Sequence, residues 1–302
     1  MRAGRPSQTA EAMAAARAIG SRVYREMGIL EDPFAGHFLG SRSKVLHTLV
    51  RRFGVGPLNR ALASAHDRML PGSIGWVLTR HRYFDDAIEG AVRDGVMQVV
   101  LIGAGYDSRA YRQQVLSKIR IFEVDHPDTQ ARKKRIVQKI FGDLPKNVVY
   151  VALNATKSDL RTLPQQGFDR GVRAVFVLEG FLWYMPPEVA RTILAAVVEI
   201  AAPGSHVIFD YILPSVVDGS CLLEGAQEHR RYCERRGEPI LFGIEPGQLA
   251  KFLNEIRLRL VDDVGQDTLK GRYAARRGRD LKVYPFLRIA RAEVAAQRGL
   301  ER

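Results

Sequence analysis

Short apolar runs alternate with amphipathic stretches along this chain, and that alternation is the main signal of its fold. Residues 99–102 are four consecutive apolar residues, a pattern typical of a strand buried on both faces of a parallel sheet. Helical periodicity surrounds such runs, which predicts a doubly wound, mostly parallel α/β sheet. The further predicted strands are 121–124, 148–151, 174–178 and 206–209, and the predicted helices are 76–92, 108–112, 127–140 and 186–200.

The chain is long enough for one large α/β domain, and we expect a single domain over residues 1–302. Alanine and apolar residues at helical spacing predict a first helix that ends near Tyr24. Such an N-terminal helical addition could fold over a pocket as a lid, or it could simply cover sheet surface. The expected parts are a helical cap (1–95), a cofactor-binding core (96–212), a substrate-site insertion (213–245) and a C-terminal helix and hairpin (246–302).

A glycine turn follows the first strand, and an acid follows the second. Gly103-Ala104-Gly105 lets the backbone turn sharply and admits a ligand against bare main chain. Asp125 comes twenty residues after Gly105, where an acid can accept hydrogen bonds from both hydroxyls of a ribose. The pair indicates a cofactor that carries a nucleoside.

The residues next to the glycines favour S-adenosyl-L-methionine over NAD. The dinucleotide fingerprint needs a third glycine, but Ser108 stands there. Asp107 lies where a pyrophosphate would approach, and a carboxylate suits a cationic amino-acid moiety better than an anion. S-adenosylmethionine has a ribose, an amino group and a sulfonium, and no phosphate.

Polar or glycine residues stand at or just past the end of each predicted strand: Gly103, Asp125, Asn154, Glu179 and Asp210. The carboxyl ends of parallel strands meet at one edge of a sheet, where ligands of open α/β sheets bind. We therefore expect this edge to form the floor of an active site.

Charge and cysteine content restrict the partners. The net charge is +13, but the basic residues are spread along the chain. No RNA-binding motif with aromatic residues between basic ones is present, and we therefore do not expect a nucleic-acid partner. The two cysteines, Cys221 and Cys233, form neither a disulfide framework nor a metal signature, so no metal is expected. No signal-peptide pattern or membrane span is present, and we expect a cytoplasmic protein.

Six motifs together resemble the leucine carboxyl methyltransferase-like family, in particular its bacterial S-adenosylmethionine-dependent branch, found in actinobacteria and in natural-product pathways. The resemblance runs from about Pro6 to residues 283–286, nearly the whole chain. It implies a class I, Rossmann-like methyltransferase sheet that ends in an antiparallel hairpin, for which we expect strands near 257–261 and 281–289. The motifs are Ser7-Gln8-Thr9-Ala10, Asp32-Pro33, Tyr83-Phe84-Asp85-Asp86, the block 103–112, the block 122–127, and Glu179-Gly180-Phe181-Leu182-Trp183-Tyr184.

The resemblance also implies roles for the cofactor-binding residues. Arg80 matches an arginine that holds the carboxylate of the cofactor's methionine, a task that suits a guanidinium fork, although Arg82 is only two residues away. Gly103, Ala104 and Gly105 match the cofactor loop, and Asp125 matches the ribose acid. Glu179 matches a strand-end acid that lines the cofactor pocket; alternatively it is a buried carboxylate paired with Arg109.

The chain departs from the family after the third strand. Family members usually have an aspartate there, followed by leucine or phenylalanine, and this chain has Asn154-Ala155. An amide oxygen can still accept a hydrogen bond from the adenine amino group. Ala155 would give the adenine less apolar cover, which predicts weaker cofactor binding.

The expected activity is transfer of a methyl group from S-adenosylmethionine to a carboxylate or hydroxyl oxygen of a small molecule, acidic or phenolic, in secondary metabolism. No catalytic residue is assigned. A hydroxyl acceptor would profit from a base, for which Tyr184, Tyr211 and His229 are candidates, His229 fitting a surface position better. Two alternatives stay open: a protein that binds the cofactor without turnover, and a nucleic-acid methyltransferase. Arginines in the segment 213–244 could receive an acidic acceptor; they are Arg230, Arg231, Arg235 and Arg236.

Overall fold

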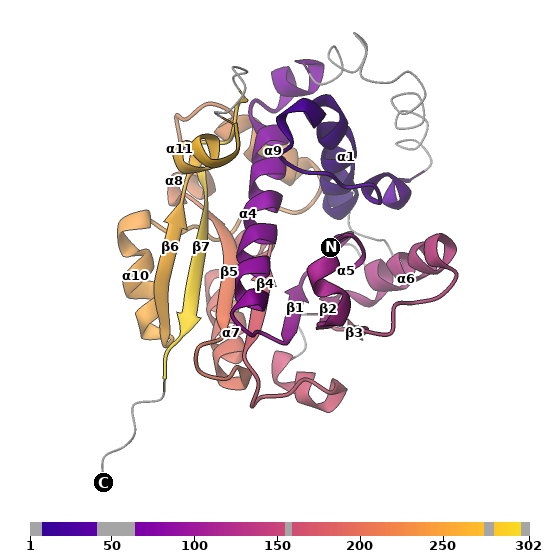
Figure 1. Cartoon of the computed structure of the whole chain (residues 1–302). Helices are drawn as coiled ribbons and strands as arrows, with labels where there is room; N and C mark the ends of the chain where they lie inside the picture. The colour runs from indigo at the N-terminus through magenta and orange to yellow at the C-terminus, as the bar shows by residue number, and fades with distance from the viewer. Residues whose placement is uncertain (1–7, 41–63, 155–158, 275–280, 297–302) are drawn as a thin grey trace.

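The computed structural model describes residues 8–40, 64–154, 159–274 and 281–296, and this part of the chain is built around one seven-stranded sheet (Figure 1). The strand order is β3-β2-β1-β4-β5-β7-β6. The first five strands are parallel, and β7 is antiparallel to both β5 and β6. The strands are β1 (Gln98–Ile102), β2 (Arg120–Asp125), β3 (Val148–Ala152), β4 (Ala174–Leu178), β5 (His206–Ile212), β6 (Leu258–Val264) and β7 (Leu287–Val294).

Both faces of the sheet are covered, which explains the continuous apolar runs. In β1, Val99 and Leu101 pack into one hydrophobic cluster with α4 (Ser73–Arg93). Val100 and Ile102 point to the other face and pack with α7 (Pro187–Ile200) and α10 (Pro246–Glu255). Since side chains alternate across a strand, a strand covered on both sides must be apolar at every position. The predicted doubly wound fold is confirmed.

The predicted helices are present with small changes at their ends. α1 (Gln8–Val23), α4 and α6 (Pro127–Phe141) match the periodicity closely. α6 begins as expected for a proline at the first position, because that residue needs no N–H partner there. The remaining short helices are α5 (Arg109–Arg112), α8 (Pro214–Asp218), α9 (Ala226–Arg235), α11 (Gln266–Leu269), η1 (Arg25–Met27), η2 (Ala35–Phe38), η3 (Gln114–Lys118), η4 (Leu160–Gln166), η5 (Leu182–Tyr184) and η6 (Lys270–Ala274).

The second strand of the expected hairpin was placed too early. β6 and β7 do form the antiparallel pair, but β7 begins at Leu287, whereas the prediction began at residue 281. Residues 281–286 instead pack against the start of α4, where a Cβ on Gly75 would meet the carbonyl oxygen of Lys282 at 2.0 Å. Pro285 also has no N–H for a strand ladder. Apolar content alone could not separate this core-packed segment from a strand.

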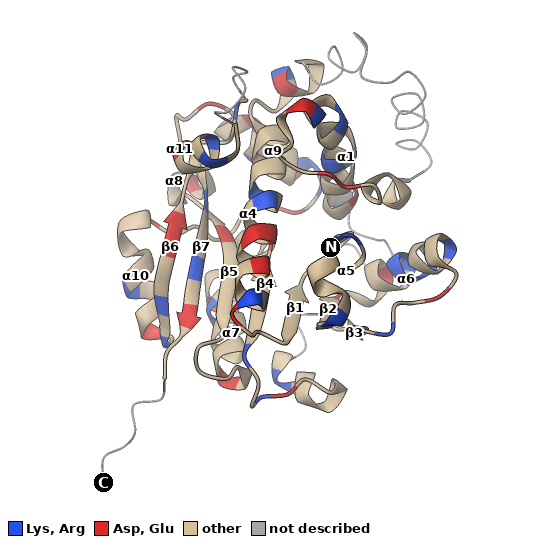
Figure 2. Ribbon diagram, in the orientation of Figure 1, with Lys and Arg blue, Asp and Glu red and all other residues tan. Residues whose placement is uncertain are grey.

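The strand order changes direction beside β1. The chain passes from β1 to β2 and β3 on one side and then crosses to β4 on the other side of β1. At such a switch point the connections diverge and leave a crevice at the carboxyl ends of the strands. Basic and acidic positions are mixed along the elements in the view of Figure 2, with no helix or strand that is basic throughout. The strand order therefore predicts a ligand site in the crevice between the carboxyl ends of β1 and β4.

Candidate active site

A cavity of about 540 Å³ lies at this crevice, a size typical of small-molecule sites. Its floor consists of the residues that follow β1, β2, β3 and β4, and α1 forms another wall. A further wall comes from the segment after η5 and the loop after α9. Seven of the eight predicted site residues fall in the described ranges, and all seven line the cavity. One is Arg80 on α4, and the other six are at strand ends: Gly103, Ala104, Gly105, Asp125, Asn154 and Glu179.

The glycine loop is held close to β2 by its backbone. The amides of Gly103 and Ala104 both donate to the carbonyl of Val124, at 2.9 and 3.1 Å. Gly103 has φ +71° and Gly105 has φ +45°, in the left-handed region that favours glycine. A Cβ on Gly103 would lie 2.4 Å from the Phe181 ring, so only glycine lets that ring close over the loop.

Asp125 is the last residue of β2, and it lines the cavity. Its carboxylate accepts hydrogen bonds from the amides of Gly105 and His126, the latter at 2.6 Å. Burial raises the pKa of Asp125, against the effect of these two amides. The acid thus ties the end of β2 to the glycine loop and presents oxygen to the same space, as a ribose-binding acid requires.

Arg80 rather than Arg82 lines the cavity. Arg80 is buried on α4, with Nη1 2.5 Å from Asp210 Oδ2 and Nε 3.0 Å from Glu179 Oε1. Arg82 is partly exposed on the same helix and pairs with Asp86 one turn later, at 2.7 Å. The α4 periodicity puts only one of the two arginines on the inner face. Asp210, the fifth strand-end residue, lies against Arg80 and does not line the cavity.

Glu179 is the centre of a group of buried charges that we call the Glu179 cluster: Arg80, His81, Asp85, Asp107, Arg109, Arg112, Glu179 and Asp210. Glu179 contacts Arg80, His81 Nδ1 at 2.9 Å and Arg109 Nη2 at 2.8 Å. Both interpretations of this acid therefore hold together, since it lines the cavity and also pairs with Arg109. Burial alone would raise the pKa of Glu179, but His81 and the two guanidinium groups hold it well below its usual range.

The other arginine at the cavity, Arg17, fastens α1 to the glycine loop. Its Nε lies 2.9 Å from Asp32 Oδ2, and its Nη2 donates to the carbonyl of Tyr106 at 2.5 Å. Asp32 also accepts from the Ser108 hydroxyl at 2.7 Å. The Asp32-Pro33 motif thus holds a wall of the cavity in place, a role the sequence did not reveal because Arg17 is distant from both Asp32 and Tyr106.

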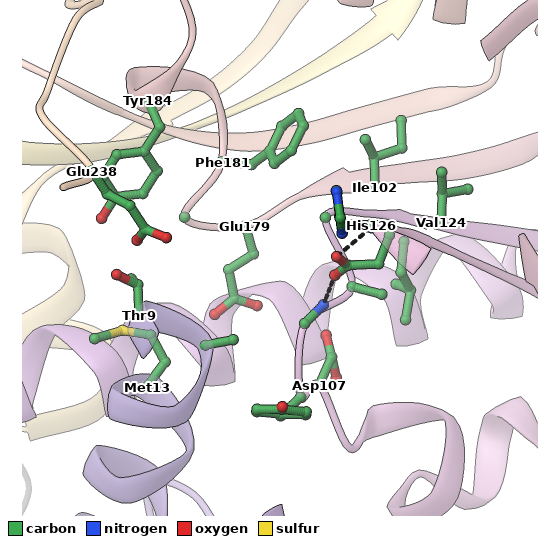
Figure 3. Close-up of a pocket in the computed structure, with 18 of the residues that line it drawn as sticks. Thr9, Met13, Ile102, Asp107, Val124, His126, Glu179, Phe181, Tyr184 and Glu238 are labelled. Carbon is green, nitrogen blue, oxygen red and sulfur yellow. Dashed lines mark hydrogen bonds between the residues drawn. The ribbon is translucent and has the colours of Figure 1, made fainter. Parts of the chain in front are cut away.

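The adenine end of the predicted site is partly described. Leu153 and Asn154 line the cavity just after β3, and Ile102 and Val124 add apolar surface (Figure 3). Ala155, and Ser7 of the N-terminal motif, lie outside the described residues. His126, which sequence reasoning missed, also lines this end and caps α6.

Of the three candidate bases, only Tyr184 lines the cavity. Tyr184 lines the cavity, and burial raises its pKa well above the usual range, so its hydroxyl stays protonated. Tyr211 bonds Asp263 on β6 at 3.0 Å and lies elsewhere. The expected surface position of His229 was wrong: it is buried against Tyr284 and Phe286 and does not line the cavity, because α9 turns this face inward.

The arginines of α9 do not line the cavity. Arg231 and Arg235 are exposed, and Arg230 pairs with Glu234 at 3.2 Å. Arg236 lies over the Tyr232 ring, 3.8 Å from its centroid. The four arginines are thus outside the cavity wall, because the face of α9 that packs inward is His229 and Cys233, and their contact with an acidic acceptor stays a prediction. The insertion reaches the cavity through the loop that follows α9, namely Gly237, Glu238, Pro239 and Leu241.

Three further features of the described residues bear on function. No helix among them has the length and apolar character that a membrane crossing requires. No group of three or more His, Cys, Asp or Glu side chains in these ranges could hold a metal ion. Cys221 and Cys233 are both buried free thiols.

The strand order, the glycine loop after β1 and the acid after β2 define a class I, Rossmann-like methyltransferase. The sequence profile described as leucine carboxyl methyltransferase matches residues 10–198, and the chain belongs to this family. A protein of Mycobacterium marinum named "Putative S-adenosyl-L-methionine-dependent methyltransferase" is 31% identical over 234 residues, which cover 76% of this chain and 72% of the relative. A Mycobacterium avium protein of the same name is 30% identical over 73% of this chain and 70% of its own length.

Solved structures agree on the fold. A crystal structure described as "a putative methyltransferase from Thermobifida fusca" superposes with a TM-score of 0.57 at 16% identity, over 80% of this chain and 90% of that one. The family match and the named relatives make the protein an S-adenosyl-L-methionine-dependent methyltransferase. The cavity suits this cofactor, since it offers bare main chain, an acid at the end of β2, apolar surface and carboxylates for a cation.

Proposed function

We propose that this enzyme transfers the methyl group of S-adenosylmethionine to an oxygen, carboxylate or hydroxyl, of a small molecule, as a cytoplasmic enzyme of secondary metabolism. The observation that carries the proposal is the continuation of the cavity beyond the glycine loop. There a space lies between α1 on one side and Tyr184 and Leu241 on the other. Its walls include the apolar side chains of Met13, Phe181 and Met185. Apolar walls around a few polar groups suit a small organic acceptor.

The predicted site residues receive roles in this proposal. Asp125 would accept hydrogen bonds from the ribose hydroxyls, and Asn154 one from the adenine amino group. Arg80 would contact the methionine carboxylate, and Glu179 would face the amino group. The main chain of Gly103, Ala104 and Gly105 would lie against the methionine part; the part played by Ala155 stays a prediction.

The bound cofactor supplies an electrophilic methyl group on a sulfonium. The protein's contribution is mainly to position the acceptor oxygen in line with the carbon–sulfur bond and to exclude water. Four carboxylates and two guanidinium groups are among the described residues that line the cavity. Both guanidinium groups already contact carboxylates, so the cavity favours a cationic cofactor.

A methyl-transfer screen tests the proposal. Purified protein is incubated with methyl-labelled S-adenosylmethionine and a panel of small carboxylic acids, phenols and alcohols, and label transfer and S-adenosylhomocysteine are measured. We expect label on an oxygen of at least one small molecule. Cofactor binding without transfer would support a protein that lacks turnover, and label in added RNA or DNA would support a nucleic-acid methyltransferase.

A further inference from the structure

His81 is the imidazole of the Glu179 cluster, and it has no part in the roles proposed for the cofactor-binding residues. It lies on α4, is 1% exposed and lines the cavity. Its Nδ1 lies 2.9 Å from Oε1 and 3.1 Å from Oε2 of Glu179, and 3.1 Å from Nη2 of Arg109. In Figure 3 the Glu179 carboxylate extends into the space between Met13 of α1 and Asp107. The imidazole therefore contacts the acid that would face the amino group of the cofactor.

The contacts of Nδ1 determine which nitrogen of His81 carries the proton. Arg109 Nη2 already donates to Glu179 Oε2 at 2.8 Å, so this guanidinium N–H is engaged with the carboxylate. A proton on Nδ1 gives the same carboxylate a second donor, whereas a lone pair there would face two negative oxygens at hydrogen-bond distance. The network thus favours the proton on Nδ1 and leaves Nε2 unprotonated.

Nε2 of His81 is buried and has no hydrogen-bond partner among the described residues. An imidazolium would place a charged N–H donor there without an acceptor, which costs more than a neutral nitrogen left unpaired. Burial accordingly lowers the pKa of His81, against the effect of Glu179, which raises it. His81 is therefore neutral near pH 7, and the cluster keeps its excess of negative charge.

The charged groups that act on His81 come from several elements. They are Glu179 after β4, Arg109 on α5, Asp107 before α5, Asp85 on α4 itself and Asp32 before η2. Carboxylates outnumber guanidinium groups in this set, which suits a cationic ligand. A positive charge on His81 would cancel one negative charge of the cluster and compete with the cofactor for Glu179.

We propose that His81 is a positioning residue, whose Nδ1–H holds the Glu179 carboxylate toward the amino group of S-adenosylmethionine and whose neutral state is required for tight cofactor binding. This inference rests on the cofactor arrangement of the proposed function and is independent of the acceptor. It makes the cofactor site sensitive to pH. Affinity falls as pH falls through the titration of His81, and cofactor binding in that range releases a proton.

Matched variants separate the two nitrogens of His81. In His81→Asn an amide nitrogen takes the place of Nδ1 and cannot gain a proton, in His81→Gln the amide lies nearer the place of Nε2, and His81→Ala removes both. The control is His206→Asn, because His206 begins β5, away from the carboxyl ends of the strands, and does not line the cavity. Each protein is titrated with S-adenosylmethionine in a calorimeter from pH 8 to pH 5, and circular dichroism checks its fold.

At pH 8 we expect the Kd of His81→Asn to stay within about threefold of the wild type. His81→Gln and His81→Ala should lose about 10- to 100-fold, the range for a hydrogen bond to a charged group. From pH 7 to pH 5 the wild type and His206→Asn should lose about three- to tenfold more affinity than His81→Asn, which cannot become charged. Asp210, whose pKa burial raises to about 6, titrates in all of these proteins and cancels from the comparison.

Nitrogen-15 NMR of the wild-type imidazoles tests the same inference without a variant. We expect His81 to show a protonated Nδ1 and an unprotonated Nε2 at pH 7, and its pKa to fall further when S-adenosylmethionine binds, because the bound cation disfavours a second positive charge. This measurement decides the inference even where a His81 variant does not fold.

The inference and the proposed function fail in different ways. An Nε2–H tautomer or an imidazolium at pH 7, a His81 pKa that the cofactor leaves unchanged, or an equal pH dependence in the wild type and folded His81→Asn would overturn the inference and leave the proposed function standing. Cofactor binding with the expected pH dependence but no transfer to any small molecule would overturn the proposed function alone. A wild type that does not bind the cofactor would overturn both.

Discussion

Two glutamates belong to charge clusters that differ in their access to the cavity: Glu123 on β2 is fully buried, and Glu179 after β4 is partly exposed. Lys133 Nζ lies 2.8 Å from Glu123, each side chain is about 1% exposed, and Tyr111 donates to the same carboxylate at 2.9 Å. None of these residues lines the cavity. Glu179 has three cationic or imidazole partners, is 11% exposed and lines the cavity.

The pKa directions express the difference. Burial raises the pKa of Glu123 in spite of Lys133, whereas the partners of Glu179 overcome burial and hold its pKa well below the usual range. In the Glu179 cluster four carboxylates (Asp85, Asp107, Glu179, Asp210) meet three guanidinium groups (Arg80, Arg109, Arg112). Burial lowers the pKa of His81, so with this imidazole neutral the cluster has an excess of one formal negative charge. The buried Glu123–Lys133 pair has no access to the cavity and can only stabilise the fold. The Glu179 cluster borders the cavity with an excess of negative charge, so it can also bind a cation.

The largest effect is expected from Lys133→Ala. It leaves Glu123 buried without its cation, which should lower the free energy of unfolding by about 3–5 kcal/mol. A carboxyl whose folded pKa is above its unfolded pKa destabilises the fold only where it ionises, so the loss should shrink as pH is lowered. Urea denaturation at pH 7 and pH 5 measures both.

The control for this prediction is Lys139→Ala, an exposed lysine on the same helix, with an expected effect within about 0.5 kcal/mol. Cofactor affinity of folded Lys133→Ala should match that of the wild type. A loss below about 1 kcal/mol, or a large drop in cofactor affinity, would contradict the structural role of the Glu123 pair.

Arg80→Lys tests the open cluster. Lysine keeps a positive charge opposite Asp210 and Glu179 but cannot present the guanidinium fork, so cofactor affinity should fall by about 1.5–3 kcal/mol. Arg82→Lys, on the same helix with an exposed partner, should change it by less than about 0.5 kcal/mol. Titration calorimetry with S-adenosylmethionine gives both values; equal effects would mean that Arg80 does not contact the cofactor.

A smaller effect is expected at the adenine end. Asn154→Asp introduces the residue more common in the family, and a charged acceptor should tighten cofactor binding by about 0.5–1 kcal/mol. The same calorimetry measures it. Weaker binding by the variant would show that Asn154 serves another contact.

Local patterns predicted the sheet and its cofactor edge well. Strands 99–102 and 174–178 are recognisable because β1 and β4 are buried on both faces, and the residues that follow them reach the cavity by topology alone. The β7 boundary was harder, because residues 281–286 are as apolar as a strand but pack against α4.

The acceptor side depended on long-range packing. Residues Arg231 and Arg235 share a helix face, as the spacing predicts, but the sequence does not say that this face is exposed. Glu238 reaches the cavity through the cap at Gly237, and a glycine just after a predicted helix is a signal that could have located this turn. The Arg17–Asp32 and Glu179–Arg109 pairs join residues too far apart in sequence for any local pattern.

Calorimetric titration of Asp125→Ala with S-adenosylmethionine tests the central claim, that the cofactor lies on the glycine loop with its ribose at Asp125. Removal of two charge-assisted hydrogen bonds should cost about 2–4 kcal/mol, or about 30- to 1000-fold in Kd, in a protein that remains folded by circular dichroism. Asp143→Ala, an exposed aspartate outside the cavity, should bind like the wild type. Unchanged affinity in folded Asp125→Ala would contradict the claim.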